Sequence, residues 1–280
     1  MHRLIGLLAL CIAVPASANK ASNPAFLGVG MDDSGGGGMR GVGPCVINSV
    51  ERGSGAEAAS LQPGDVFEKL DGASIANCDT LVGLITSRTP GTVIQLDIRR
   101  HAQPLKIKAE LLTRDEILRR RLVGHTLPAT ELLRVEDKAT TDLSAVKRTT
   151  IVGWYPTNCA GCDAVLATVG RWSRDRTNKR APIAVVAATA GDLSMRRSAA
   201  DNLEQLLLAQ RALDVPLLAA DYDTYARFAM KDIDRVHFMV IDCRGAVAYV
   251  APIVPNTDDT SAVLDELYAA AEQTARRMTR

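Results

Sequence analysis

The most informative segment of the C-terminal half reads Trp154-Tyr155-Pro156-Thr157-Asn158-Cys159-Ala160-Gly161-Cys162. It continues an apolar run, residues 149–155, that is typical of a buried strand, and it leads into a helical pattern over residues 162–173. Two cysteines at this spacing can close a small disulfide ring. The dipole and free N–H groups of a helix N-terminus stabilise a thiolate, so Cys159 is expected to be the more exposed and more acidic thiol. This context predicts thiol–disulfide chemistry, in which the second thiol resolves a mixed disulfide.

Three other uses of the cysteine pair need to be considered. A zinc site needs further ligands, and Cys243, His101, His125 and His237 show no ligand spacing. Haem attachment needs a histidine directly after the second cysteine, where Asp163 stands. An inert structural disulfide remains open. We therefore expect no metal and no cofactor.

The rest of this half alternates strand and helix patterns. Strands are expected over residues 183–188, 236–242 and 246–250, and helices over residues 199–213 and 260–279. One side of the first helix carries Ala199, Leu203, Leu206 and Leu207. The alternation predicts an α/β domain with a mixed sheet and helices on both faces.

The N-terminal half has a different texture, with short β-like runs separated by glycine. The expected strands are residues 26–29, 45–50, 66–70, 93–98 and 105–108, with a flexible loop at Gly35–Gly38. Short helices are expected over residues 55–61 and 79–87. We predict a small, mostly β domain over residues 24–113, a connector over 114–128 with a short helix at 115–122, and the α/β domain over 129–278.

Part of this half resembles a PDZ domain of the kind found in exported serine proteases. The match centres on residues 50–66, from Val50-Glu51-Arg52-Gly53 to Pro63-Gly64-Asp65-Val66, and continues in Leu70-Asp71-Gly72. Gly55 stands where proline is common, and Ser60 stands where glycine is common. The resemblance covers about 90 residues.

The PDZ resemblance implies a peptide-binding edge. Its loop, Phe26-Leu27-Gly28-Val29, would offer N–H groups to a peptide carboxylate while the peptide adds a strand to the sheet. Leu81 and Ile85 would line the groove from the neighbouring helix. Packing in the core of the domain explains these two apolar residues equally well. By the same resemblance Cys45 starts a strand and Cys78 precedes the groove helix, so a disulfide between them could staple the domain. Two unpaired buried cysteines are the alternative.

The C-terminal half resembles thioredoxin-like proteins, in particular exported oxidoreductases and their peroxiredoxin-like relatives. The resemblance spans roughly residues 122–278 and includes residues 124–128, 154–159 and 241–245. It implies that Cys159 is the attacking cysteine and Cys162 the resolving one. It also predicts a protein redox partner.

Three departures from the thioredoxin pattern are visible. Asn158 replaces the usual tryptophan, and Ala160-Gly161 replaces Gly-Pro inside the ring. The cis-proline that normally faces the cysteines is absent, and Val236 falls near its place. Pro156 stands where a peroxiredoxin has threonine, which disfavours peroxidase activity.

The N-terminus reads as an export signal rather than as part of the fold. A basic start, an apolar run over residues 4–14 and an A-x-A ending at Ala18 form a secretory signal peptide, residues 1–18. We expect a periplasmic or secreted protein that begins near Asn19; N-terminal sequencing that found Met1 retained in exported protein would contradict this.

Oxidising conditions would permit disulfides among the five remaining cysteines. Cys243, in a hairpin turn roughly 20 Å from the pair by strand length, is expected to stay free.

Composition excludes several function classes. The 280 residues carry 33 Lys and Arg against 32 Asp and Glu, so the net charge of +1 disfavours nucleic-acid binding. After the leader, no stretch is apolar enough to span a membrane. A serine protease lacks any G-x-S-x-G motif. Two hypotheses remain: an exported thiol–disulfide oxidoreductase whose PDZ domain binds a peptide end of a partner or client, and a non-catalytic redox sensor or scaffold that binds peptides.

Overall fold

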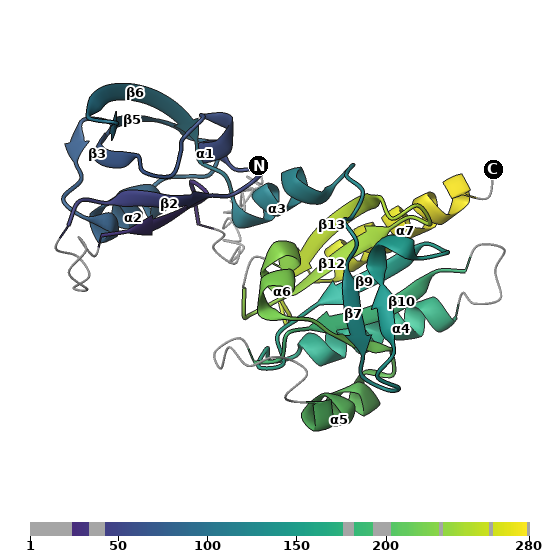
Figure 1. Ribbon diagram of the computed structural model, residues 1–280. Helices are drawn as coiled ribbons and strands as arrows, with labels where there is room; N and C mark the ends of the chain where they lie inside the picture. Colours follow the sequence, from purple (N-terminus) through teal and green to yellow (C-terminus); the bar gives the residue numbers. More distant parts are fainter. Residues whose placement is uncertain are drawn as a thin grey trace, which may run out of the picture.

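The structure is a computed structural model that describes residues 24–33, 43–175, 182–192, 203–229, 232–257 and 260–278. Within these residues each half of the chain builds its own sheet (Figure 1). The expected signal peptide, the Gly35–Gly38 loop and Ala199 lie outside the described residues. None of the helices in the described segments has the length and apolar character needed to cross a bilayer.

The N-terminal half is an antiparallel sheet with two short helices. Its described strands are β1 (Val29–Asp32), β2 (Val46–Val50), β3 (Val66–Leu70), β4 (Ala73–Ser74), β5 (Val93–Arg100) and β6 (Gln103–Glu110). They are arranged in the order β1-β2-β3-β5-β6, with β4 paired to β3. Helices α1 (Gly55–Ala58) and α2 (Cys78–Thr86) complete this half. The outer side of β1 therefore has no strand partner among the described residues, which leaves an edge open to an added strand.

The C-terminal half is a mixed sheet whose centre is strand β9. Its strands are β7 (Glu131–Arg134), β8 (Thr140–Asp142), β9 (Thr150–Trp154), β10 (Ala184–Thr189), β11 (Leu217–Ala219), β12 (Val236–Ile241) and β13 (Val247–Ile253), in the order β13-β12-β9-β10-β11-β7-β8. β9 runs parallel to β10 and antiparallel to β12, and β12 forms a hairpin with β13. The fold class expected from the sequence, a mostly β half followed by an α/β half, is confirmed.

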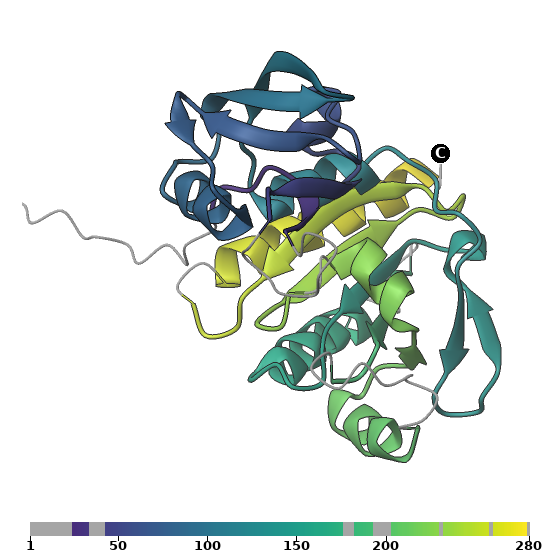
Figure 2. The ribbon, with the colours of Figure 1, turned by 60° about the vertical axis from the view of Figure 1, so that its left-hand side comes forward.

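Helices cover both faces of the second sheet (Figure 2). One face carries α4 (Cys162–Arg174), α5 (Leu203–Leu213) and α7 (Thr260–Met278), and the other carries α3 (Arg114–Leu122) and α6 (Tyr222–Ala229). Side chains alternate between the faces along β12: Val236, Phe238 and Val240 pack with α4, while Met239 and Ile241 pack with α3 and α6. This period of two is what a strand buried on both sides requires.

Helix α3 directly follows the first sheet but packs against the second. It begins after Thr113, whose hydroxyl accepts a hydrogen bond from the Glu116 N–H at 3.0 Å. Its buried residues Ile117, Leu118 and Leu122 share a core with Trp154. Arg119–Arg121 occupy its last turn, where cations complement the helix dipole.

Two expected elements of the first half differ from the structure because of backbone conformation. The strand expected over residues 26–29 is interrupted: Phe26 bridges Leu112, Gly28 takes a left-handed φ of +85°, and β1 begins only at Val29. The helix expected over residues 55–61 ends at Ala58, because Ser60 also adopts a left-handed φ, of +58°.

Five short elements of the second half were not predicted. The hairpin β7–β8 is polar and partly exposed, and β11 has three residues, so neither produces a periodic pattern. The short 3-10 turn η1 (Leu143–Ala145) lies between β8 and β9. Helix α6 did leave a readable signal, since Asp221 stands at its start and its carboxylate accepts from the Thr224 N–H at 2.7 Å.

Candidate functional site

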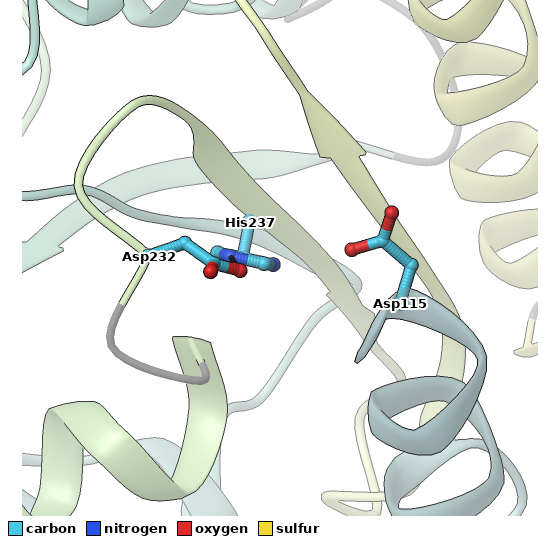
Figure 3. A group of neighbouring side chains, drawn as sticks. All are labelled: Asp115, Asp232 and His237. Atoms are coloured by element: carbon cyan, nitrogen blue, oxygen red, sulfur yellow. Dashed lines mark hydrogen bonds and ion pairs between the residues drawn. The ribbon is translucent and has the colours of Figure 1, made fainter. Parts of the chain in front are cut away.

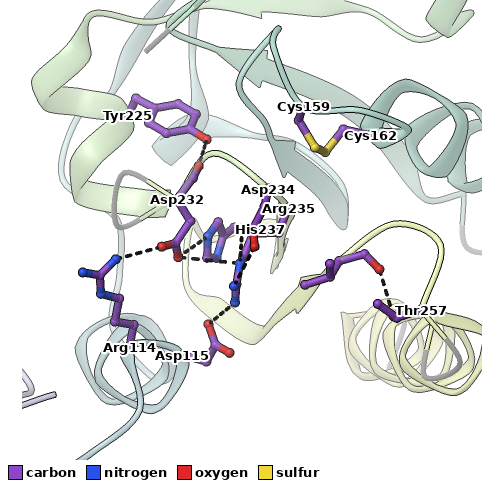
Figure 4. Close-up of polar contacts among 11 residues, drawn as sticks. Arg114, Asp115, Cys159, Cys162, Tyr225, Asp232, Asp234, Arg235, His237 and Thr257 are labelled. Carbon is purple, nitrogen blue, oxygen red and sulfur yellow. Dashed lines mark hydrogen bonds and ion pairs between the residues drawn. A yellow bond between two sulfur atoms is a disulfide. The ribbon is translucent and has the colours of Figure 1, made fainter. Parts of the chain in front are cut away.

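Cys159 and Cys162 form a disulfide where strand β9 gives way to helix α4 (Figure 4). Their Cα atoms lie 5.6 Å apart. Helix α4 begins at Cys162, as the helical pattern over residues 162–173 predicted, so Cys159 lies in the loop just before the first helical residue. The disulfide nevertheless ties the Cys159 sulfur to the first residue of the helix. The unpaired N–H groups of that turn are suited to stabilise a thiolate there.

The two sulfurs differ in access to solvent. Cys162 is 0% exposed, whereas Cys159 is partly exposed and packs at the border of the same core. An external thiol or disulfide can therefore reach Cys159 but not Cys162. This is the asymmetry that an attacking and a resolving cysteine need.

The loop that carries Cys159 is held from three sides. The Cys159 N–H donates to the Pro156 carbonyl at 3.1 Å, and the Thr157 N–H donates to the Gly191 carbonyl at 3.1 Å. Gly161 has a φ of +84°, and a Cβ there would lie 3.1 Å from both Pro255 and Asn256. A side chain at residue 161 would thus be strained in both backbone and packing, which explains a glycine inside the ring.

Val236, which by the sequence resemblance falls near the place of the cis-proline, is the first residue of β12, and β12 pairs with β9. Val236 is fully buried and belongs to the same cluster as Tyr155, Cys162 and the bordering Cys159. No cis peptide bond occurs within the described segments. Burial and, to a smaller extent, the charge of Asp163 raise the pKa of the Tyr155 phenol, so it stays neutral beside the pair.

Cys243 lies at the other end of the sheet. It follows Ile241, which pairs with Thr150 at the start of β9, whereas the cysteine pair follows the end of β9. Its thiol is free and contacts the Met278 sulfur at 3.2 Å. Strand geometry therefore separates it from the pair by the length of β9.

A cluster of Asp115, Asp232 and His237 was not anticipated from the sequence (Figure 3). The Nε2–H of His237 donates to the Asp232 carboxylate at 3.1 Å, Arg114 pairs with Asp232, and Arg235 pairs with Asp115. Two arginines already neutralise the two aspartates, so a cation would have to displace them, and we assign the cluster as an ion network. Burial tends to raise the pKa of Asp232, but the hydrogen bond from His237 and the charges of His237, Arg235 and Arg114 outweigh it and lower that pKa. The only sequence signal was a histidine at the start of a strand.

The expected peptide-binding loop lies at the free edge of β1. Phe26 is partly buried, Leu27 and Val29 are buried, and Gly28 packs so closely that a Cβ there would lie 2.1 Å from the Ser54 Cβ. Within the described part of the chain, the N–H groups of Leu27 and Gly28 donate to no backbone carbonyl. Free donors next to an open strand edge fit the capture of a peptide carboxylate.

The two residues expected on the groove helix lie in the core. Leu81 and Ile85 are buried together with Leu27 and Val29, and Val82 is the exposed apolar side chain of α2. Core packing therefore accounts for Leu81 and Ile85.

Cys45 and Cys78 are joined by a disulfide, with Cα atoms 4.7 Å apart. It links the residue before β2 to the first residue of α2. The Asp33 carboxylate accepts from the Cys78 N–H at 3.2 Å, and the Met31 sulfur lies 3.5 Å from the Cys45 sulfur. The end of β1 is thereby fixed to the start of α2, on either side of the edge where a peptide would bind.

Comparison with known proteins agrees with this division. Residues 25–111 match the PDZ domain family, so this part of the chain is a PDZ domain. It is similar to the structure of the HtrA-type protease AlgW with decapeptide, at 23% identity and a TM-score of 0.29, over 32% of this chain and 30% of that one. The chain thus spans less than a third of that protease. No curated protein sequence matches the chain.

The C-terminal half is similar to two further structures. One is a Bacteroides thetaiotaomicron protein assigned as a protein disulfide isomerase, at 15% identity and a TM-score of 0.41, over 54% of this chain and 90% of that one. The other is BsSco, a member of the Sco family of cytochrome c oxidase assembly proteins, at 14% identity and a TM-score of 0.37, over 52% of this chain and 94% of that one. The strand order and the cysteine pair after the central strand make this half thioredoxin-like.

Proposed function

We propose that this chain, a PDZ domain followed by a thioredoxin-like half with a C-x-x-C pair, is an exported thiol–disulfide oxidoreductase. One observation carries the proposal: a partly exposed Cys159 is disulfide-bonded to a buried Cys162 at the start of α4. A pair whose only accessible sulfur lies at a helix N-terminus is suited to exchange electrons with other proteins.

The chemistry needs only the two cysteines and a partner disulfide. The Cys159 thiolate attacks one sulfur of the partner's disulfide, forms a mixed disulfide and releases the other partner sulfur as a thiolate. The Cys162 thiolate then attacks the Cys159 sulfur, which frees the second partner thiolate and leaves the Cys159–Cys162 disulfide. Two electrons pass to the partner, and the same steps in reverse oxidise a dithiol. The direct test is reduction of insulin's disulfides by the reduced full-length protein.

The structure supplies three supports for this exchange. The first turn of α4 is suited to stabilise the Cys159 thiolate, which raises the fraction of Cys159 that can attack a partner disulfide at neutral pH. The buried, neutral Tyr155 adds no competing charge. Val236 and Cys162 belong to the same buried cluster, which keeps Cys162 away from solvent.

A second candidate function is a non-catalytic redox sensor or scaffold. Val236 in place of a cis-proline favours it, because this residue is fully buried and offers no docking surface to an incoming chain. In this case the pair would report the redox state without turning over a client. The insulin assay separates the two candidates, since a sensor would not reduce insulin.

The PDZ domain is proposed to bind peptides that end in a free carboxylate. Peptides selected on the full-length protein from a random C-terminal library are expected to bind at least tenfold more weakly once amidated, because the N–H groups near Leu27 and Gly28 lose a charged acceptor. Fluorescence polarisation of matched acid and amide peptides measures this. Equal affinities would remove carboxylate capture.

Two glycine variants provide a matched control for the site of capture. Gly28 and Gly72 share a φ of +85°, but a Cβ at Gly28 meets Ser54, whereas at Gly72 it meets nothing within 4 Å. Gly28→Ala is therefore expected to abolish peptide binding and Gly72→Ala to preserve it. Similar losses in both variants would indicate general destabilisation instead.

A further inference from the structure

Arg114, the first residue of α3, contacts both halves of the molecule. Its guanidinium carbon lies 5.0 Å from the centre of the Phe26 ring, in the proposed carboxylate-binding loop. Its Nη1 lies 3.1 Å from Oδ1 of Asp232, in the segment that precedes β12 (Figure 4). Arg114 is 44% exposed, so a ligand at the loop can reach it.

A second residue of α3 lies beside the same loop. A Cβ on Gly28 would be 3.5 Å from Cδ1 of Ile117, one turn after Arg114. The N-terminal half of α3 therefore lines the loop in which the N–H groups of Leu27 and Gly28 donate to no backbone carbonyl of the described residues. The guanidinium of Arg114 is the cation that this helix brings to the loop.

On its other side, Arg114 belongs to the buried ion network. The second oxygen of Asp232 faces Nε2 of His237 at 3.1 Å and Nε of Arg235 at 3.9 Å. His237 is 1% exposed, and its Nδ1 has no hydrogen-bond partner among the described residues. A buried carboxylate depends on its partners, so a change at Arg114 alters the balance of forces on Asp232.

The network continues to the cysteine pair through strand β12. His237 pairs with Trp154, the last residue of β9, directly before the loop that carries Cys159. Its neighbour Val236 packs in the cluster with Tyr155 and Cys162. The segment that Arg114 anchors thus leads into Val236, which shares a buried cluster with Cys162.

We propose that Arg114 is a further ligand-binding residue, shared between Asp232 and the C-terminal carboxylate of a peptide bound at Phe26–Val29. The proposal rests on the peptide binding and redox activity proposed above. A guanidinium has five donors and can pair with two carboxylates, but each carboxylate weakens the ion pair that the guanidinium forms with the other. A bound peptide therefore loosens Asp232 and the segment before β12. Peptide binding then shifts the dithiol–disulfide equilibrium of Cys159 and Cys162, and the redox state shifts peptide affinity by the same factor.

The first test needs no peptide. The contact to Asp232 is present with the pair oxidised. In the proposed coupling this contact is weaker when the pair is reduced, so its loss should favour the dithiol. The equilibrium constant of the pair, measured in full-length protein by alkylation and mass spectrometry in dithiothreitol buffers, is expected to move about threefold toward the dithiol in Arg114→Ala, which is about 14 mV. Phe26→Ala should move it in the same direction, and Arg114→Lys should restore part of the difference.

Arg88→Ala is the matched control for this measurement. Arg88 is 39% exposed and pairs with Asp71 at 3.0 Å, close to the exposure and distance of the Arg114 pair, but within the PDZ domain. In Arg88→Ala the dithiol–disulfide equilibrium constant of Cys159 and Cys162 should stay at the wild-type value. Unchanged constants in both Arg114→Ala and Phe26→Ala would overturn the coupling, as would an equal shift in Arg88→Ala.

The second test uses a free-carboxylate peptide selected on the full-length protein, together with its amide. The acid should shift the wild-type constant toward the dithiol and bind Arg114→Ala several-fold more weakly, while the amide should do neither. Binding with no shift would overturn the coupling but leave peptide capture standing. A wild-type protein that fails to reduce insulin would contradict the proposed redox function separately, since the equilibrium constant is measurable without a client.

Discussion

Cys159→Ser is expected to reduce insulin no faster than buffer alone, whereas Cys162→Ser is expected to accumulate a covalent adduct with insulin. Without the Cys159 sulfur no accessible thiolate can attack, because Cys162 is buried. Without Cys162 the attack survives but resolution does not, so the mixed disulfide persists. Turbidity of reduced insulin measures the rate, and non-reducing gel electrophoresis with mass spectrometry identifies the adduct.

Cys243→Ser is the control for this pair of variants. Cys243 lies at the opposite end of β9 and contacts Met278, so its loss should leave the insulin rate unchanged. If Cys159→Ser trapped the adduct and Cys162→Ser did not, the two roles would be reversed. If wild type and Cys159→Ser were equally inactive but still bound peptide, the scaffold function would replace the oxidoreductase.

The double substitution Cys45→Ala with Cys78→Ala is expected to lower the free energy of unfolding by about 3–4 kcal/mol, the loop-closure value for this loop length. The disulfide closes a loop with a sequence separation of 33 residues, so its removal frees the unfolded chain. Alanine is chosen because Cys45 is fully buried and a serine hydroxyl would be desolvated there. Urea unfolding without reductant, followed by circular dichroism, measures the change.

The peptide assay adds a second readout to the same double variant. Because the disulfide fixes α2 beside the end of β1, its loss should weaken peptide binding even where the protein remains folded. Cys243→Ser again serves as the control and should change neither stability nor affinity. A decrease in the free energy of unfolding of less than about 1 kcal/mol would show that the unfolded chain gains little conformational freedom when the disulfide is removed.

The sequence predicted the parts of the fold that rest on local patterns. The buried runs around Ile151 and Phe238 and the helix after Cys162 follow from periodicity, and the cysteine spacing pointed to the redox site. The sequence did not predict where α1 ends, because Ser60 adopts a left-handed conformation that serines rarely show. It also left Leu81 and Ile85 undecided between groove and core, since burial depends on the whole sheet.

The contacts between the halves were not predictable in the same way. Phe26, Arg114 and Asp232 are far apart in the sequence and meet only because α3 packs on the second sheet. Arg114 looks like any charged residue at a helix start. A single sequence contains no signal that such a residue will join two domains.

The packing of α3 also decides where the chain can be divided. A C-terminal fragment that begins at residue 129 would lack Ile117, Leu118 and Leu122, which fill the core beside Trp154. Loss of three such side chains costs about 1.5–3 kcal/mol each and leaves an apolar face exposed to aggregation. A fragment that begins at Thr113 keeps the helix and its capping hydroxyl. A protease that separates the two domains would therefore have to cut the chain before α3 for the C-terminal domain to remain stable.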